Sequence, residues 1–154
     1  MNLVQVLTFF HVTFVVLALG FMVFPGILLN QIAASGDVAA IRTAFRVGMY
    51  HGRVGGALLG IGVLFGFGVA SIAHFPLLSG WLIAAYVAVL ALVFLGIAFH
   101  QRHEAAIFAA ASSGRTEAGA DCIKLAGSAA AMVLNSISGL VWLFAIFDMI
   151  VKPF

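Results

Sequence analysis

The stretch Leu78–Phe99, LSGWLIAAYVAVLALVFLGIAF, decides the fold class because it contains no charged residue from end to end. A helix needs about 20 mainly apolar residues to cross the hydrocarbon core of a bilayer. Inside that core only helices and closed barrels satisfy their backbone hydrogen bonds. The run is far longer than the alternating strands of roughly 10 residues that build a barrel. The stretch therefore predicts a membrane-spanning helix.

Three further stretches meet the same requirement, and the composition of the chain agrees with them. Of its 154 residues, 64% are hydrophobic and 8% are charged, whereas a soluble domain carries about 25% charged residues. We therefore predict an all-α, polytopic membrane four-helix bundle, in which residues 1–154 form a single integral membrane domain within the lipid bilayer. The other three predicted helices are Val4–Ile32, Val47–Ala73 and Ile123–Val151.

Three connections join the predicted helices, and their composition indicates where the chain turns. The first contains Gly36-Asp37, a typical turn pair, and the second is short enough to form a tight hairpin. The third contains Ser112–Gly114, which we expect to separate an extension of the third helix from the start of the fourth. The connections are Ala33–Arg46, His74–Pro76 and His100–Cys122.

Lys and Arg residues are distributed unevenly between the two sides of the predicted bundle. All of them except Lys152 lie in or beside the first and third connections. Because positive residues concentrate in cytoplasmic loops, we predict that these connections are cytoplasmic and that both termini are outside. Topology thus explains the basic residues, so we predict no nucleic-acid site and expect the inner (plasma) membrane of a bacterium.

The second predicted helix is unusually rich in glycine, with eight of the 17 glycines of the chain between Gly48 and Gly68. Glycines spaced four residues apart allow a neighbouring helix to approach closely, either within the bundle, in a membrane partner or in a second copy of the chain. A smooth strip would also form a flat wall against a planar cofactor such as a porphyrin. The two uses are compatible if different glycines serve each of them.

Histidines within the predicted helices are the main candidates for a functional site, because ionisable residues inside a membrane are costly. They are His11 in the first helix, His51 in the second and His100 at the end of the third. Each is explained either as an imidazole hydrogen-bonded between helices or as a ligand of a b-type haem. Arg53 is predicted either to extend to the membrane interface or to hold a carboxylate of a bound molecule.

The depths of these histidines determine which of them could act together. At about 1.5 Å per residue, His11 lies in the outer half of the membrane and His100 at the inner boundary, more than about 10 Å away. His51 and His100 differ in depth by about one turn and belong to neighbouring helices. We therefore predict His51 and His100 as an inner ligand pair and His11 as a separate outer site.

A second group of polar residues gathers in the third connection. His100, His103 and Glu104 share one helix face, and Glu117 and Asp121 have the same spacing of four residues. This set is either a binding site for a divalent metal or an ordinary polar membrane face. The single cysteine, Cys122, excludes an internal disulfide, and we expect it to be a buried residue.

Polar residues in the last predicted helix are expected to have structural roles. Asn135, Ser136 and Ser138 lie near its middle and are predicted to form hydrogen bonds between helices. Asp148 and Lys152 are four residues apart near the carboxyl terminus and are predicted to form an exposed ion pair.

Several short motifs together resemble the small four-helix membrane proteins typified by the HemJ-type protoporphyrinogen oxidase, within a superfamily that includes copper-resistance-D-like domains. The resemblance implies a b-type haem, oxidation of a porphyrinogen ring, and His11 and His100 as matching positions. The family's lysine after the tryptophan of the third helix is absent, and His51 stands where the family has an arginine. The motifs are His11-Val-Thr-Phe-Val-Val, Met49-Tyr50-His51-Gly52, Gly80-Trp81-Leu82, Asn135 and Val151-Lys152-Pro153-Phe154.

Three functions are compatible with these features. The first hypothesis is a haem- or porphyrin-binding redox protein of the membrane, with His11, His51 and His100 as candidate ligands. The second is a non-catalytic subunit that packs its glycine face against a larger membrane complex. The third is a copper- or other metal-handling membrane protein, with His100, His103 and Glu104 as ligands.

Overall fold

The computed structural model describes residues 2–152, which form helices and their connections and contain no strand. The all-α fold class is confirmed. Four continuous helical segments are long and apolar enough to cross a membrane: α1, α2, the run Gly80–Ser112, and α6. The elements are α1 (Leu3–Ser35), α2 (Val38–Ile72), α3 (Gly80–Leu95), the π-helical turn η1 (Gly96–His100), α4 (Gln101–Ser112), α5 (Ala118–Ala126) and α6 (Ala129–Val151).

The second helix begins nine residues earlier than hydropathy predicted, at Val38 rather than Val47. The carboxylate of Asp37 accepts hydrogen bonds from the backbone N–H groups of Ala39 and Ala40, both at 3.0 Å. This cap satisfies backbone donors that the start of a helix leaves without partners. The turn predicted at Gly36-Asp37 is confirmed, because Gly36 has a φ of +72°.

The boundaries of the third and fourth predicted helices also differ from the prediction. The third continues beyond Phe99 as far as Ser112, and the predicted break follows it, where Gly114 has a φ of +70°. The predicted helix Ile123–Val151 is wrong as a single helix, because Gly127 and Ser128 separate α5 from α6. The hydroxyl of Ser128 accepts a hydrogen bond from the N–H of Ala131 at 3.3 Å. Ser128 therefore caps the amino-terminal end of α6, where a new helix begins.

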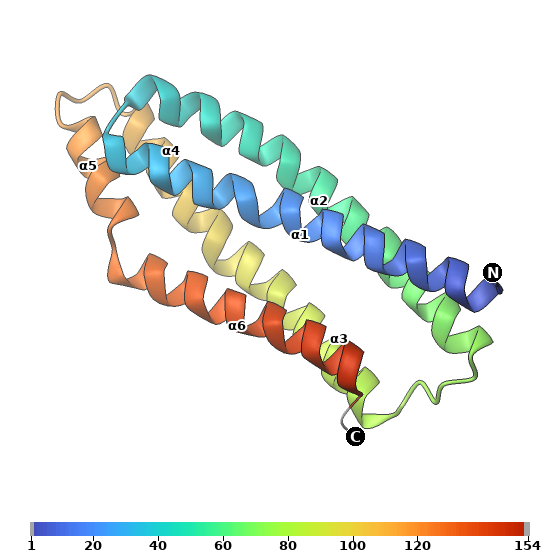
Figure 1. Ribbon diagram of the computed structural model, residues 1–154. Coiled ribbons are helices and arrows are strands. Elements are labelled where there is room, and N and C mark those ends of the chain that lie inside the picture. The colour runs from blue at the N-terminus through green and yellow to red at the C-terminus, as the bar shows by residue number, and fades with distance from the viewer. Residues whose placement is uncertain (1, 153–154) are drawn as a thin grey trace. The chain divides into compact units, whose positions relative to one another are not determined.

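The chain forms two compact units, of which the first combines the residues up to Leu29 with Thr43–Pro76. In this unit α1 and α2 lie side by side as a helical hairpin (Figure 1). A set of glycines on α2 makes the close approach possible, because a Cβ at each would meet atoms of α1. The tight positions are Gly55 against Met22, Gly62 against Val15 and Gly66 against His11, whereas a Cβ at Gly48 would make an ordinary contact with Pro25.

Other glycines of α2 are not used in this packing. Gly52, Gly56 and Gly60 are exposed, and no described atom lies within 4 Å of the position that a Cβ would take. They recur every four residues, so they form one strip along the helix. The glycines of the second helix thus divide into a face packed against α1 and an open strip.

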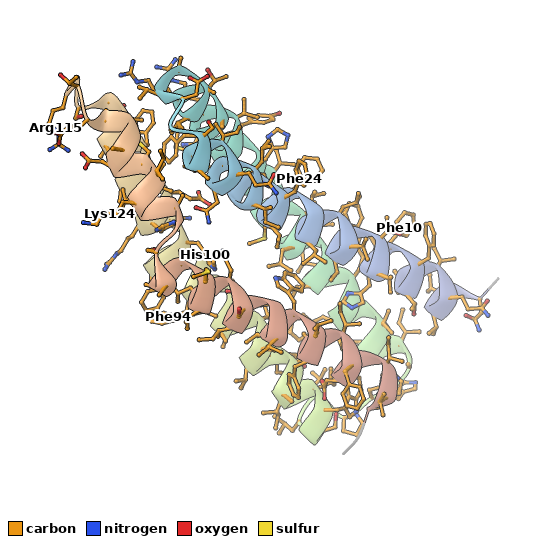
Figure 2. The ribbon with its side chains drawn as sticks, turned by 60° about the vertical axis from the view of Figure 1, so that its left-hand side comes forward. Phe10, Phe24, Phe94, His100, Arg115 and Lys124 are labelled. Atoms are coloured by element: carbon orange, nitrogen blue, oxygen red, sulfur yellow. The ribbon has the colours of Figure 1, made fainter. Side chains whose placement is uncertain are left out.

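The second unit combines Asn30–Arg42 with the residues from Leu77 onward. Within it α3 packs against α6, and α4 packs against α5. The guanidinium of Arg42 donates two hydrogen bonds to the carbonyl of Ala111, from Nε at 2.9 Å and from Nη2 at 2.6 Å. Arg115 and Lys124 lie at the α4–α5 end of this unit, whereas Phe94 and His100 lie nearer its α3–α6 part (Figure 2).

The predicted exposed ion pair between Asp148 and Lys152 is wrong. Asp148 is 0% exposed, and neither of its carboxyl oxygens has a hydrogen-bond partner among residues 2–152. The ammonium of Lys152 lies instead over the ring of Trp81, 5.0 Å from its centroid. Lys152 takes a left-handed conformation, with φ at +49°, and ends α6 there. The helical spacing that motivated the prediction therefore stops one residue before Lys152.

Replacing Gly62 with leucine is expected to destabilise the α1–α2 hairpin. A Cβ at Gly62 would lie 3.0 Å from Val15 Cγ2 and 3.3 Å from the Val15 backbone nitrogen. Overpacking of this kind costs about 1–3 kcal/mol, so the thermal midpoint of the purified protein in detergent should fall. Gly60→Leu is the matched control and should leave the midpoint nearly unchanged. Equal losses in both variants would contradict the division into a packed face and an open strip.

Candidate functional site

The imidazole of His11 bridges the two helices of the first unit. Its Nδ1 lies 2.7 Å from the carbonyl oxygen of Gly62, and the ring rests against Gly66, where a Cβ would be 2.9 Å from it. A carbonyl accepts but cannot donate, so Nδ1 carries the proton. The contact confirms the predicted hydrogen bond between helices. It also leaves Nε2 as the nitrogen with a free lone pair.

His51 is held in the same tautomer, but by its own helix. Its Nδ1 lies 2.8 Å from the carbonyl of Val47, one turn earlier in α2, so this nitrogen also donates. The ring stacks on Phe21 of α1, with 5.4 Å between centroids and 23° between the planes. Nε2 again keeps its lone pair. Histidines that bind metals usually have this arrangement, in which the second nitrogen donates to a carbonyl and fixes the ring.

A groove lies beside His51 in the first unit, with a cavity volume of about 390 Å³. Except for His51, the residues that line it are apolar. Gly20 contributes open space, since no described atom lies within 4 Å of its Cβ position. No pattern in the sequence indicates this groove, because it depends on which faces of α1 and α2 meet. The lining residues are Val16, Leu17, Gly20, Phe21, Phe24, Pro25 and His51.

The two histidines of the first unit do not share one site. His51 is level with Phe21 on α1, whereas His11 is level with Gly62 and Gly66 on α2. At about 1.5 Å per residue these levels are roughly 15–20 Å apart along the helices. Arg53 is exposed and does not line the groove. It follows His51 by two residues, and side chains at this spacing point away from each other on a helix.

His100 belongs to the second unit, where it ends the π-helical turn η1. Its Nε2 lies 2.8 Å from the hydroxyl of Ser138 on α6. The predicted hydrogen bonding between helices is therefore confirmed for Ser138, whereas Ser136 bonds the Met132 carbonyl of its own helix. A π-helical turn inside an α-helix is rare and often marks a functional position. Because His51 and His100 fall in different units, their action as a ligand pair stays a prediction.

The remaining residues proposed as metal ligands lie one turn further along α4. His103 Nε2 is 3.3 Å from the side-chain oxygen of Asn30, and both His103 and Glu104 are half-buried. Among residues 2–152, no three His, Cys, Asp or Glu side chains come close enough together to hold a metal ion. The structure therefore does not bring His100, His103 and Glu104 together as a three-ligand set, and metal binding by these residues stays a prediction.

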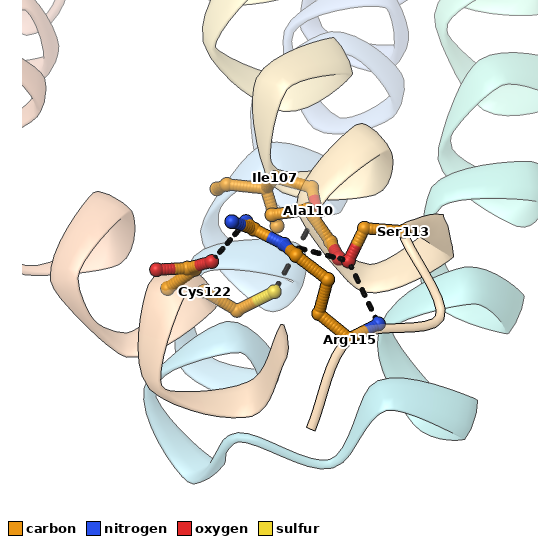
Figure 3. Close-up of polar contacts among 6 residues, drawn as sticks. Ile107, Ala110, Ser113, Arg115 and Cys122 are labelled. Carbon is orange, nitrogen blue, oxygen red and sulfur yellow. Dashed lines mark hydrogen bonds and ion pairs between the residues drawn. The ribbon is translucent and has the colours of Figure 1, made fainter. Parts of the chain in front are cut away.

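The polar contacts at the α4–α5 end have a structural role. Arg115 forms an ion pair with Asp121, and its backbone N–H donates to the Ser113 hydroxyl at 3.4 Å (Figure 3). Cys122 is fully buried and its thiol lies 3.6 Å from the carbonyl of Ile107. Burial raises the pKa of the Cys122 thiol, and the neighbouring Asp121 carboxylate raises it further. These contacts close the turn between α4 and α5.

Comparison with known proteins gives no relative from which a function could be transferred. No protein-family model, no curated protein and no solved structure matches the chain significantly. The resemblance to the HemJ-type family therefore rests on the short motifs alone. The site must be judged from its own geometry.

Cys122 is expected to react slowly with iodoacetamide in the folded protein at mildly alkaline pH. Its thiol is buried, and the raised pKa lowers the fraction of the reactive thiolate. Unfolding in a denaturing detergent should accelerate labelling many-fold, as measured by mass spectrometry. Ala120→Cys in a Cys122→Ser background is the control, because residue 120 is exposed in the same helix. Equally rapid labelling of both cysteines in the folded protein would contradict the burial of Cys122.

Proposed function

We propose that the protein is a membrane redox protein that binds a b-type haem or a related porphyrin in the α1–α2 groove, in the inner membrane of a bacterium. The observation that carries the proposal is the setting of His51. Its imidazole faces an apolar groove of about 390 Å³, and its Nδ1 donates to the Val47 carbonyl. This leaves Nε2 as the ring nitrogen that would bind haem iron.

The other features of the groove fit a planar, mainly apolar ring. Ligand sites in proteins are typically concave, mostly apolar, and provided with few polar groups. Phe21 and Phe24 offer aromatic surfaces, and Gly20 leaves room beside them. These side chains would bind the ring and exclude water, while His51 would orient it. When bound, the haem supplies one-electron oxidation and reduction, which none of the lining side chains could perform.

The remaining predicted ligands take secondary roles in this proposal. His11 has the same Nδ1-to-carbonyl contact and would serve a separate site at its own level of the hairpin. Arg53 faces away from the groove, so we do not assign it a carboxylate of this ring. The resemblance to the HemJ-type family supports a tetrapyrrole as the ligand. Oxidation of a porphyrinogen stays a further proposal, because the family's lysine is absent.

Replacing His51 with alanine is expected to weaken haem binding at least tenfold, because even second-shell changes cost about 10–100-fold in metal affinity. Haemin is titrated into the purified protein in detergent, and binding is read from the Soret absorbance. His74→Ala is the matched control, since His74 is an exposed histidine that lies outside the groove. Added imidazole should restore the absorbance in His51→Gly. A wild-type protein that stays colourless, or equal affinities in the two alanine variants, would refute the proposal.

A second candidate function is supported by the open strip Gly52, Gly56 and Gly60. Strips of this spacing bring membrane helices together, and this one is not covered by α1. The strip would pack against a helix of a partner, for which a second copy of this chain is the simplest choice. In this role the protein is a non-catalytic subunit of a larger membrane assembly.

Gly56→Leu is expected to reduce self-association, because a large side chain would hold the two helices apart. Energy transfer between differently labelled copies in lipid vesicles measures the association. Gly139→Leu is the control, since Gly139 is an open glycine on α6 with no other glycine in that helix. Unchanged energy transfer in Gly56→Leu would exclude the strip as a contact between copies.

A further inference from the structure

The α3–α6 pair of the second unit contains a buried acid that the proposed haem site does not use. Asp148 is the single acidic residue of α6, and its side chain is 0% exposed. Neither carboxyl oxygen has a hydrogen-bond partner among the described residues. The other buried residues of α3 and α6 are all apolar. They are Leu82, Ala85, Ala88, Leu92 and Ala131.

Few charged or titratable groups lie on the elements next to Asp148. The helix packed against it, α3, contains no Asp, Glu, Lys, Arg or His, and Tyr86 is its only titratable residue. Just before α3, His74 is exposed in the link. On the carboxyl-terminal side, Lys152 follows Asp148 by four residues. Its ammonium lies over Trp81, 5.0 Å from the ring centroid, and neither carboxyl oxygen of Asp148 has a hydrogen-bond partner among residues 2–152.

The burial of the Asp148 carboxyl group without a hydrogen-bond partner among the described residues favours its neutral form. An ionised carboxylate removed from water and from any counter-ion is far less stable than the neutral acid. The hydroxyl of Ser79, at the start of α3, is also buried and has no hydrogen-bond partner in the described part of the chain. The α3–α6 pair therefore holds polar groups whose hydrogen bonds are not completed by the described residues, which is rare for groups that serve packing alone.

We propose that Asp148 is a proton-binding site of the α3–α6 pair, neutral in the arrangement described and able to exchange its proton with water. In the exchange the O–H bond of the acid breaks, the carboxylate keeps the electron pair, and the proton passes to a water molecule. Lys152 begins the chain beyond α6, so its ammonium can reach the carboxylate by leaving Trp81. The ion pair so formed would stabilise the deprotonated state.

This proposal is independent of the haem site, because it uses none of the groove residues. An ionisable residue inside a membrane helix is a functional candidate by default, and proton transfer is a common role for buried acids. The acid needs no oxidant or cofactor for this exchange. Its test can therefore be made on protein that contains no haem.

Infrared spectroscopy tests the proposal through the C=O stretching band of a protonated carboxyl group. The full chain is purified in lipid nanodiscs, and spectra are recorded from neutral to alkaline pH. We expect a band at neutral pH that disappears on alkalinisation and that is missing in Asp148→Asn, which keeps the shape of the side chain. Asp37→Asn is the matched control: Asp37 is an exposed carboxylate that caps α2, so its removal should leave the band intact.

A second variant tests the role of Lys152 without changing the acid. Lys152→Met should retain the band at neutral pH, and its loss should require a higher pH because the carboxylate then lacks its counter-ion. In a Trp142→Phe background, the fluorescence emission of Trp81 should change over the same pH range in which the infrared band disappears. The change is expected because the Lys152 ammonium then leaves the Trp81 ring. A wild-type spectrum without the band, or a band that never disappears while the protein stays folded, would overturn the proton site. An identical pH profile in Lys152→Met would overturn the part assigned to Lys152.

Discussion

The hydrocarbon core of a bilayer offers no hydrogen-bond partners, and this constraint governs both the fold and the placement of polar side chains in this protein. Backbone groups bond within helices, so the apolar segments are long and uninterrupted. Polar side chains then depend on carbonyls that the helices already contain. His11 donates to Gly62, and His51 donates to Val47. A helical carbonyl has a second lone pair, so it accepts such a bond without losing its own.

The same constraint explains how far the sequence could predict the fold. Four apolar segments suffice to identify the four spans, because no soluble arrangement could bury them. Helix boundaries are harder to predict from hydropathy. An apolar stretch ends at its first polar residues, whereas backbone hydrogen bonding can continue the helix beyond them. Asp37 therefore starts α2 well before its apolar part, and Ser128 restarts a helix inside one apolar stretch. Both capping residues are visible in the sequence, but only local backbone geometry shows that they are used.

The candidate sites were predictable only in part, for a related reason. The cost of an imidazole in a membrane identifies His11 and His51 without knowledge of the fold. The groove beside His51 depends on how α1 and α2 are rotated against each other, which glycine spacing alone leaves open. Asp148 was misjudged because the spacing of four residues predicts a pair only while the helix continues. The left-handed backbone at Lys152 ends the helix and directs that side chain to Trp81.

Completeness of hydrogen bonding separates the structural polar groups of this chain from its functional candidates. Arg42 donates to Ala111, and Ser128 caps α6, so the contacts of each account for its presence. His51 has one ring nitrogen bonded to the Val47 carbonyl, and its side chain lines an apolar groove. Asp148 is buried, and neither of its carboxyl oxygens has a hydrogen-bond partner among residues 2–152. Selection for stability alone favours replacing such groups with apolar residues of similar volume. The presence of these two groups in a chain with so few polar residues is explained if the imidazole binds haem iron and the acid binds a proton.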